Sequence, residues 1–478
     1  MLGRMLEVTN TLTRSRARLT APAGRPLALY SCGPTVYRYA HIGNLRTFLL
    51  ADLVRRVLAH DGVEVNAVQN ITDVGHLADD RLDHGQDKML LSAGLEGRST
   101  EEIAEFYTAA YLADAARLNL LPYDAHPRAT EHVGAMLQLI ARLEAKGHAY
   151  DTPDAVYFDV RTFPAYGRLS GNRLSELRPG AGAGSPHKRF HGDFALWRKA
   201  GGRRDAAWDS PWGRGFPGWH IECSAMSLAL LGDHVDVHLG GVDLAFPHHE
   251  SEIAQSEAAV GHRVVDVWVH GEHLLSDGRK MSKSAGNFVD LRTLADRGAD
   301  PLAFRLLCLQ ARYRAQFNFT LDALLGAERT LRRLRARTAE LAAASGPAAP
   351  ASSPCDLPEA LTAGLGTRFS GALHDDLDTP AALRVVHEVA AGEGDAAGLD
   401  AARRAALLRR WDAVLGLDLA RDAAGGGALP AGASQLLERR DRARAERDWP
   451  AADRLRTALA DLGVAVVDGP DGTTWTAR

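Results

Sequence analysis

The sequence has 478 residues, 46% of them hydrophobic, and a formal net charge of −4. One hydrophobic core seldom serves more than about 250 to 300 residues, so this length indicates a multidomain protein. The small net charge excludes attraction of nucleic acid through overall charge, and no apolar run approaches the roughly 20 residues that a membrane span needs.

The N-terminal region predicts a nucleotide-binding βαβ unit. Residues 26–31 alternate like a strand, and the tight loop His41-Ile42-Gly43-Asn44 precedes an amphipathic helix. A second strand is expected at 63–68. The amides and positive dipole at the start of such a helix favour phosphate, so this loop is a candidate phosphate-binding site.

The middle of the chain reads as an insertion followed by a second half of the sheet. Helices are expected at 101–118 and 130–146, and the Gly/Pro-rich residues 178–187 predict a surface loop. A strand at 264–269 then leads to Lys280-Met281-Ser282-Lys283-Ser284. Two ammonium groups and two hydroxyls in a loop of small residues suit a triphosphate, although a plain surface loop has the same composition.

The C-terminal third reads as helical. Apolar spacing predicts helices from residue 300, a linker at 342–354, and further helices at 357–417. After a Gly-rich stretch, residues 435–456 carry seven arginines against five acidic residues. Arg439, Arg440, Arg444 and Arg447 are expected along one helical side, where they either meet phosphate or form a salt-bridged solvated face.

The two loops at His41 and Lys280 resemble the signature motifs of class I aminoacyl-tRNA synthetases. Four further stretches narrow the resemblance to the cysteinyl-tRNA synthetase family, and the matches run from about residue 30 to residue 475. These stretches are Cys32-Gly33-Pro34-Thr35-Val36-Tyr37, Asn70-Ile71-Thr72-Asp73, Pro217-Gly218-Trp219-His220-Ile221-Glu222-Cys223-Ser224-Ala225-Met226 and Phe246-Pro247-His248-His249-Glu250.

The resemblance implies an α/β fold, with a Rossmann-like parallel-sheet catalytic domain that carries an insertion. We expect this split domain at 1–120 and 210–299 and the inserted connective region at 121–209. A helical bundle that contacts the tRNA stem is expected at 300–420, and a small anticodon-binding module at 435–478.

The activity that the resemblance implies is an ATP-dependent cysteine–tRNA ligase. L-cysteine is activated to cysteinyl-adenylate and then transferred to the 3′-end of tRNA(Cys). His41, Asn44, Lys280 and Lys283 are the expected catalytic residues. They are also expected to bind ATP, together with Gly43 and Ser282, and Mg²⁺ accompanies the ATP. Such chemistry depends on positioning and charge stabilisation.

The resemblance also assigns Cys32, Cys223, His248 and Glu252 as ligands of one zinc ion. After Pro247, His248 and Glu252 are i and i+4 on one helix face and can close on one ion, whereas spacing alone equally suits a core histidine and a surface glutamate. Zinc prefers a cysteine thiolate to a serine hydroxyl, so it would select the amino acid. His249 either orients this site or caps the helix.

Further residues are expected to contact the substrates. Thr35, Thr72 and Trp219 shape the cysteine pocket, and Asp243 holds the α-ammonium group. In the C-terminal module the expected tRNA contacts are Arg439, Arg440, Arg444 and Trp475; Trp475 stacks on a base or closes a small core. Cys308 and Cys355 read as structural or incidental.

Some positions depart from the usual family pattern: Arg38, Val74, Gly75, His76, Phe216 and Leu239. They leave open whether this is a housekeeping copy or a specialised, inhibitor-resistant one. Two other functions also stay open, a ligase that joins cysteine to an amino-sugar cyclitol and a non-catalytic tRNA-binding paralogue. The widely spaced cysteines and the polar N-terminus favour a cytoplasmic protein without membrane attachment, and we expect a monomer.

Overall fold

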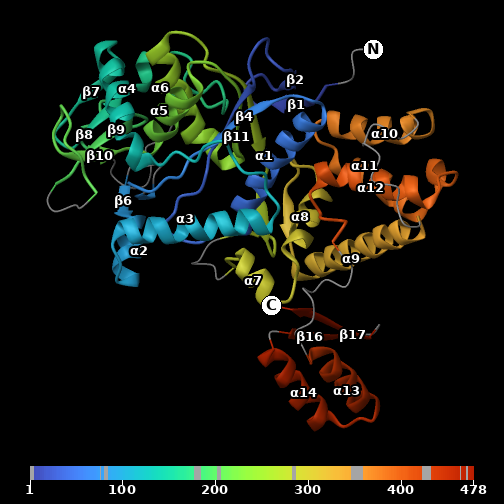
Figure 1. Ribbon diagram of the computed structural model, residues 1–478. Helices are drawn as coiled ribbons and strands as arrows, with labels where there is room; N and C mark the ends of the chain where they lie inside the picture. Colours follow the sequence, from blue (N-terminus) through green and yellow to red (C-terminus); the bar gives the residue numbers. More distant parts are fainter. Residues whose placement is uncertain are drawn as a thin grey trace.

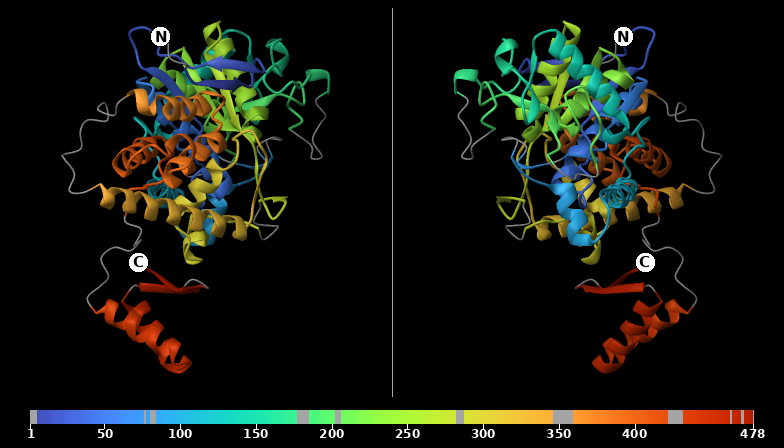
Figure 2. Two further views of the ribbon diagram at one scale, coloured as in Figure 1. Left: turned by 90° about the vertical axis from the view of Figure 1, so that its right-hand side faces the viewer. Right: turned by 90° about the vertical axis from the view of Figure 1, so that its left-hand side faces the viewer.

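The computed structural model describes residues 5–75, 77–79, 84–176, 185–201, 206–281, 287–345, 359–421, 432–462, 464–469 and 472–477. Most elements gather in one body, and a small unit at the C-terminal end of the chain lies apart from it in every view (Figures 1 and 2). Among the described residues, no helix is both long and apolar enough to cross a membrane.

A four-stranded parallel sheet forms the centre of the body. Its strand order is β12-β11-β3-β4, with every neighbouring pair parallel. The strands are β3 (Leu27–Ser31), β4 (Val65–Gln69), β11 (Val235–Gly241) and β12 (Val265–Gly271). The strand order reverses between β3 and β11, which makes the carboxyl ends of these two strands the expected place for a ligand. The predicted α/β fold and three predicted strands are confirmed.

Helix α1 (Ile42–His60) is the crossover between β3 and β4. Its start is held by a reciprocal capping box between His41 and Asn44, which satisfies amides that have no partner within the helix. Its apolar side chains are buried against the sheet and the C-terminal helices. The predicted strand, loop and helix unit is therefore present.

The inserted segment builds a second, antiparallel sheet with the order β10-β9-β8-β7. Strand β10 (Gly215–Pro217) pairs with β9 (Phe194–Lys199), although it lies beyond the predicted boundary of the insertion at residue 209. Helix α3 (Thr100–Arg117) matches its prediction, and the next predicted helix begins as a 3-10 turn. The insertion also holds β7 (Ala149–Asp151), β8 (Ala155–Phe158) and α4 (Val133–Ala145). Outside it lie α2 (Lys88–Glu96), before the insertion, and α5 (Trp219–Leu231) and α6 (Glu250–Val260), after it.

Short strand pairs flank the main sheet. An N-terminal hairpin packs against β12. A small three-stranded sheet contains Lys280 in one of its strands. These strands are β1 (Glu7–Asn10), β2 (Ser15–Arg18), β5 (Leu77–Asp79), β6 (His84–Asp87), β13 (Leu274–Ser276), β14 (Arg279–Lys280) and β15 (Phe317–Phe319).

Of the helices after residue 290, α8 (Pro301–Leu309) and α12 (Ala401–Leu415) pack against α1, and the helices up to residue 417 agree with the predicted apolar stripes. Three side chains join the two parts: Asp52 of α1 pairs with Arg56 at 2.8 Å and with Arg305 at 2.5 Å, all three buried. The helices are α7 (Leu291–Asp296), α8 (Pro301–Leu309), α9 (Leu321–Ala344), α10 (Glu359–His374), α11 (Thr379–Ala391) and α12 (Ala401–Leu415). The predicted linker lies largely outside the described residues, and α9 extends to Ala344.

The C-terminal unit has its own small core. Helices α13 (Ala433–Ala445) and α14 (Trp449–Asp461) pack together, followed by the antiparallel strands β16 (Val464–Gly469) and β17 (Gly472–Ala477). Its buried apolar residues form a cluster separate from the other cores. The prediction that Arg447 continues the helical row of arginines is wrong, because Arg447 lies between the helices with φ 61°.

Candidate active site and metal centre

A cleft of about 480 Å³ lies at the carboxyl ends of the central strands. Its wall is built from the segments that follow β3, β4, β11 and β12 and from the first turns of α1 and α5. This is the place where the strand order reverses, and parallel sheets commonly bind ligands there. Of the residues predicted from the sequence, the cleft is lined by Cys32, Thr35, His41, Gly43, Asn44, Thr72, Trp219, Cys223, Asp243 and His248.

The start of α1 fixes the chemical state of His41. The backbone N–H of Asn44 donates to His41 Nδ1 at 3.2 Å, and the His41 N–H donates to Asn44 Oδ1 at 3.3 Å. Because Nδ1 accepts, a neutral His41 carries its proton on Nε2 and offers it as a donor. A Cβ on Gly43 would come within 2.9 Å of the His41 ring, so only glycine fits this turn without displacing the ring.

The second signature motif is only partly described. The backbone of Lys280 lies in β14, and Met281 lines the cleft, whereas Ser282 and Lys283 lie outside the described residues. The chain that follows returns to α1: Ile42 N–H donates to Val289 O at 3.0 Å, and His41 bridges Asp290. The chain that follows this motif is therefore attached directly to the first one, at Val289 and Asp290.

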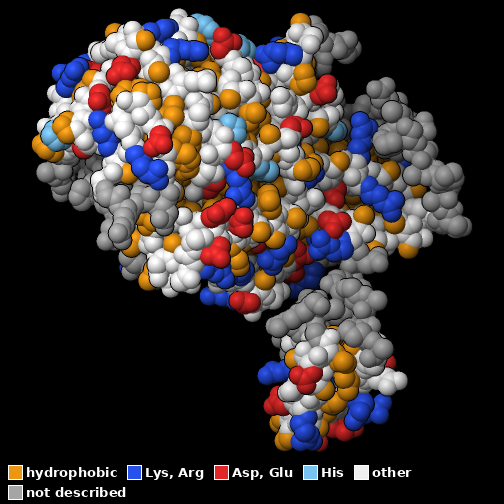
Figure 3. Space-filling view, turned by 60° about the vertical axis from the view of Figure 1, so that its left-hand side comes forward, with side chains coloured by type: hydrophobic (Ala, Val, Ile, Leu, Met, Phe, Trp, Pro, Cys, Tyr) orange, Lys and Arg blue, Asp and Glu red, His pale blue; other side chains and the backbone are white. Residues whose placement is uncertain are grey.

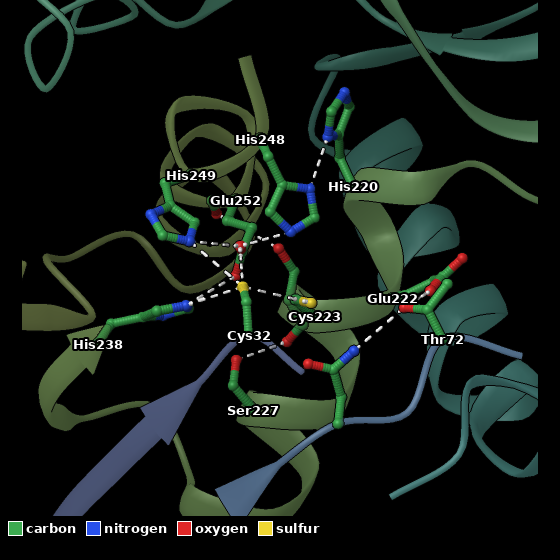
Figure 4. Close-up of polar contacts among 12 residues, drawn as sticks. Cys32, Thr72, His220, Glu222, Cys223, Ser227, His238, His248, His249 and Glu252 are labelled. Carbon is green, nitrogen blue, oxygen red and sulfur yellow. Dashed lines mark hydrogen bonds and ion pairs between the residues drawn. The ribbon is translucent and has the colours of Figure 1, made fainter. Parts of the chain in front are cut away.

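Two thiols, an imidazole and a carboxylate converge at the floor of the cleft (Figure 4). Their ligand atoms all lie within 4.8 Å of one another, and all four residues are buried: Cys32, Cys223, His248 and Glu252. The sulfurs are 3.9 Å apart, close to the roughly 3.8 Å that two sulfur ligands 2.3 Å from a tetrahedral zinc would show. The donor set therefore fits zinc.

A second group of donors overlaps the first. Cys32 and Glu252 also lie within 4.8 Å of His238 and His249. His238 and His249 do not line the cleft, whereas Cys223 and His248 do. A metal ion that meets a substrate must have an open position on the cleft side, so the first set suits a catalytic ion better.

Burial and mutual contacts shift the pKa values of these groups in opposite directions. The hydrogen bond from the Cys32 thiol lowers the pKa of Cys223 to about 7, whereas burial raises that of Cys32 well above its usual range. Burial alone would lower the pKa of His248, but Glu252, 3.1 Å away, and Cys223 raise it to about 10. Cys223 is thus the more readily ionised thiol.

Histidines from several strands and helices support the donor set. His249 Nε2 lies 3.3 Å from the Cys32 sulfur, and its Nδ1 lies 2.7 Å from His270 Nε2. On the other side, His220 Nδ1 is 3.0 Å from His248 Nδ1. His249 makes no side-chain cap to α6 and instead contacts Cys32. No local pattern marks His238 or His270 as part of this site, and His220 stands in a quoted motif without an expected role.

Thr72 is held by two buried neighbours. Its hydroxyl donates to Glu222 Oε2 at 2.8 Å and accepts from the Asn70 side-chain amide at 3.1 Å. The hydroxyl keeps one lone pair, so it can accept a further hydrogen bond but has no second proton to donate. Burial raises the pKa of Glu222 well above its usual range, and within the described part of the chain its other oxygen has no hydrogen-bond partner.

The remaining expected substrate contacts surround the same floor. The Trp219 ring stacks on the ring of His248 with centroids 4.3 Å apart, which holds the imidazole in place. Thr35 bridges Thr72 through its backbone, and Asp243 follows β11 directly. All three predicted side chains therefore border one small space next to the thiols.

Comparison with known proteins identifies the catalytic part. Residues 20–329 match the family described as tRNA synthetases class I (C) catalytic domain, and residues 426–475 match the Cysteinyl-tRNA ligase anticodon binding domain. The chain belongs to the cysteine–tRNA ligase family. It is an enzyme of the class I aminoacyl-tRNA synthetases.

Relatives span the whole chain. A cysteine–tRNA ligase of Alkalilimnicola ehrlichii is 42% identical over 98% of this chain and 99% of its own length, and one of Thermus thermophilus is 42% identical with the same coverage. Among solved structures, Mycobacterium tuberculosis methionyl-tRNA synthetase in complex with methionyl-adenylate has a TM-score of 0.54 at 16% identity. That match covers 90% of this chain and 96% of the other, and it supports the fold alone.

The departures from the family pattern fall at several places in this ligase. Gly75 and Phe216 touch each other: a Cβ on Gly75 would lie 3.1 Å from the Phe216 ring. Leu239 is fully buried in β11, and its carbonyl accepts from the Cys32 N–H, while Val74 is a core residue. Arg38 lines the cleft. His76 lies outside the described residues.

The C-terminal module corrects one expected tRNA contact. Arg440 is only 1% exposed, so it is not placed to meet an RNA phosphate. Arg439 is exposed and Arg444 is half-buried, its guanidinium 5.7 Å from the centre of the Trp449 ring. Basic and acidic side chains are interspersed on the face seen in Figure 3, including the module. The side chain of Trp475 lies outside the described residues.

Proposed function

We propose that this enzyme activates L-cysteine with ATP and transfers it to the 3′-end of tRNA(Cys). The observation that carries the proposal is the shared cleft: Cys32, Cys223 and His248 open onto the same space as His41 and Asn44, and the Glu252 carboxylate lies within 4.8 Å of these donors behind the cleft wall. Sulfur recognition and phosphate binding thus meet where an aminoacyl-adenylate would form.

We propose that Cys32, Cys223, His248 and Glu252 hold one zinc ion, on the distances and donor chemistry given above. Bound zinc would accept a cysteine thiolate and disfavour the hydroxyl of serine. The chain's own part is to keep the donors together. Trp219 fixes the plane of His248, and His249 contacts Cys32 from the side away from the cleft.

The rest of the amino acid is held by polar groups at the rim of the donor set. Asp243 offers a carboxylate to the α-ammonium group, and Thr72 offers the one lone pair that its neighbours leave unused. Both are acceptors, which suits an ammonium and repels a carboxylate. Thr35 and Trp219 complete the walls, so the substrate carboxylate points toward the nucleotide.

In adenylation the cysteine carboxylate attacks the α-phosphate of ATP, and pyrophosphate leaves with the electrons of the broken P–O bond. His41 donates its Nε2–H to phosphate oxygens, and the amides at the start of α1 add a positive field. Lys280 and Lys283 oppose the charge that develops on the triphosphate, with Gly43, Asn44 and Ser282 beside them. Mg²⁺ accompanies the ATP through phosphate and water ligands.

The acceptor is tRNA rather than an amino-cyclitol, because the C-terminal residues 426–475 match an anticodon-binding family that a small acceptor would not need. We propose the domain division expected from the sequence, with the insertion sheet extended to β10. Cytoplasmic location and a monomeric state stay predictions.

The test combines two assays. Cysteine-dependent exchange of pyrophosphate into ATP measures activation, and charging of tRNA(Cys) measures transfer. We expect both activities, with serine a poor substrate for the first. Exchange without charging, accompanied by transfer of cysteine to an amino-cyclitol, would establish the alternative ligase. Absence of exchange with zinc-loaded protein would contradict the proposal.

A further inference from the structure

Arg38 lies in the wall of the active-site cleft, three residues before His41. Its guanidinium carbon is 4.9 Å from the centre of the Tyr37 ring and 5.1 Å from that of the Phe288 ring. Both distances are within the range of cation–π attraction, so two aromatic rings hold the cation in place.

The held cation has no anionic partner in the described part of the chain. Within that part, no hydrogen bond or ion pair joins Arg38 to another residue, and the cleft's acidic side chains, Asp243 and Glu272, do not reach it. Contacts with ring faces leave the N–H donors of a guanidinium unused. Such a group in a cleft is prepared to bind an anion.

The position of Phe288 ties Arg38 to the nucleotide end of the cleft. The ring of Phe288 also contacts His41 edge-on, with centroids 5.8 Å apart. The next residue, Val289, accepts from the N–H of Ile42, the first residue of α1. Arg38 and His41 therefore share one ring beside the helix start.

We propose that Arg38 is an additional phosphate-binding residue, whose guanidinium binds the phosphate chain of ATP beside His41. The proposal rests on the proposed function of the cleft and adds a residue to it. Guanidinium binds phosphate oxygens through two parallel N–H donors, and the two rings reduce the freedom lost on binding. The site thereby gains a positive charge beside the start of α1.

The test replaces Arg38 by methionine, which keeps much of the side chain's apolar volume and removes the charge. Direct titration of the full-length protein should show about tenfold weaker binding of ATP, equal to about 1.4 kcal/mol, with binding of adenosine unchanged. The KM for cysteine and the melting temperature should not change. Arg38→Lys should restore part of the ATP affinity, because the charge returns without the planar donor pair.

Arg98→Met is the matched control. Arg98 also lies over an aromatic ring, 4.8 Å from the centre of Phe106, but it does not line the cleft. It should leave ATP affinity unchanged. Unchanged ATP affinity in Arg38→Met, with a raised KM for tRNA, would assign Arg38 to a phosphate of the tRNA end and overturn the proposal. No change in either would reduce Arg38 to packing and also overturn it.

This experiment separates the proposal from the function on which it rests. ATP binding is measured without cysteine or tRNA, so it reports on Arg38 even if the unmodified protein fails to exchange pyrophosphate. Failure of exchange in the unmodified protein would contradict the ligase function alone. Exchange in the unmodified protein with undiminished ATP binding in Arg38→Met would contradict the role of Arg38 alone.

Discussion

The thiols of Cys32 and Cys223 are the most informative pair at the residue scale. They come from a strand end and a helix, 191 positions apart, and meet at 3.9 Å. Cys32 and Glu252 belong to both overlapping donor groups, so only Cys223, His248, His238 and His249 distinguish them. Substituting one of these four residues therefore tests which donor group binds an ion.

Replacing Cys223 by serine should remove most of the bound zinc and cysteine-dependent exchange together. Loss of one of four ligands leaves the ion poorly held, and serine remains protonated where a thiolate is needed. His238→Ala should retain stoichiometric zinc, with affinity reduced by about 10 to 100-fold at most, because His238 would only support the ligands. Metal analysis of both purified variants checks this, and the reverse pattern would favour the second donor group.

Thr72 offers a second prediction at this scale. Thr72→Val keeps the shape of the side chain but removes the hydroxyl that Glu222 and Asn70 orient. We expect the KM for cysteine to rise by about ten- to a hundredfold and the KM for ATP to change little, since one hydrogen bond to a charged group is worth about 1.5 to 3 kcal/mol. Thr72→Ser, which keeps the hydroxyl, is the control; an equal loss in both variants would argue for packing.

At the scale of elements, buried charges join the catalytic sheet to the C-terminal helices. Arg305 of α8 donates to Asp52 of α1 and also to the carbonyl oxygens of Leu118 and Leu415. Asp52 accepts in turn from the Leu121 N–H. One arginine thus links four chain segments, and it is 1% exposed. Removing its carboxylate would leave a buried cation without a partner.

Asp52→Asn should lower the free energy of unfolding by about 3 to 5 kcal/mol, because breaking a buried ion pair leaves an uncompensated charge. Glu340→Gln, which breaks an exposed pair with Arg337, should cost no more than about 1 kcal/mol. Denaturant titration of both variants compares the two losses. Similar losses would contradict a structural role for the buried cluster.

Acid should destabilise the fold in part through the carboxylate of Asp52. Burial alone would raise the pKa of Asp52, but Arg305 and Arg56 hold it below its usual value. A folded-state pKa below the unfolded one means that the unfolded chain binds the proton more readily. The contribution of Asp52 is therefore complete above its unfolded pKa of about 3.8 and is lost as pH falls through the folded value. The acid-dependent difference between wild type and Asp52→Asn should shrink in that range.

At the scale of the whole molecule, α13 begins a separate unit that lies apart from the main body (Figure 2). Among the described residues, the core cluster of this unit is built from its own side chains, including Ala433, Leu437 and Leu459. The described residues that line the catalytic cleft run from Cys32 to Met281, which precede this unit in the chain. The two parts can therefore be tested separately.

Ending the chain at Gly432 should leave cysteine-dependent pyrophosphate exchange largely intact and sharply reduce charging of tRNA. The expected cause is weaker tRNA binding, because contacts with anticodon and phosphates are lost. Full-length binding should weaken as salt rises, through release of counterions. A truncated protein that charges tRNA as well as the full chain would exclude this role for the module, including Arg439 and Arg444.

The local secondary structure could be predicted from the sequence alone. The strand, loop and helix around His41, the strand before Lys280 and the helices after residue 290 follow from spacing and capping, which are set by neighbours in the chain. Quoted motifs also identified the family and the four expected zinc ligands. In the fold, the ligand atoms of these four residues lie within 4.8 Å of one another. Their spacing in the sequence alone does not distinguish them from core residues.

Contacts between side chains that are far apart in the sequence depend on the tertiary fold. His238 and His270 lie on different strands, yet both contact His249, and no local pattern marks such an encounter. Burial likewise removed Arg440 from the expected tRNA contacts, because arginine on a helix can face solvent or a core. The histidines meet because β11 pairs in parallel with β12 and with β3, which lies about 200 residues earlier in the chain. Such pairings depend on the packing of the whole chain rather than on residues that are neighbours in the sequence.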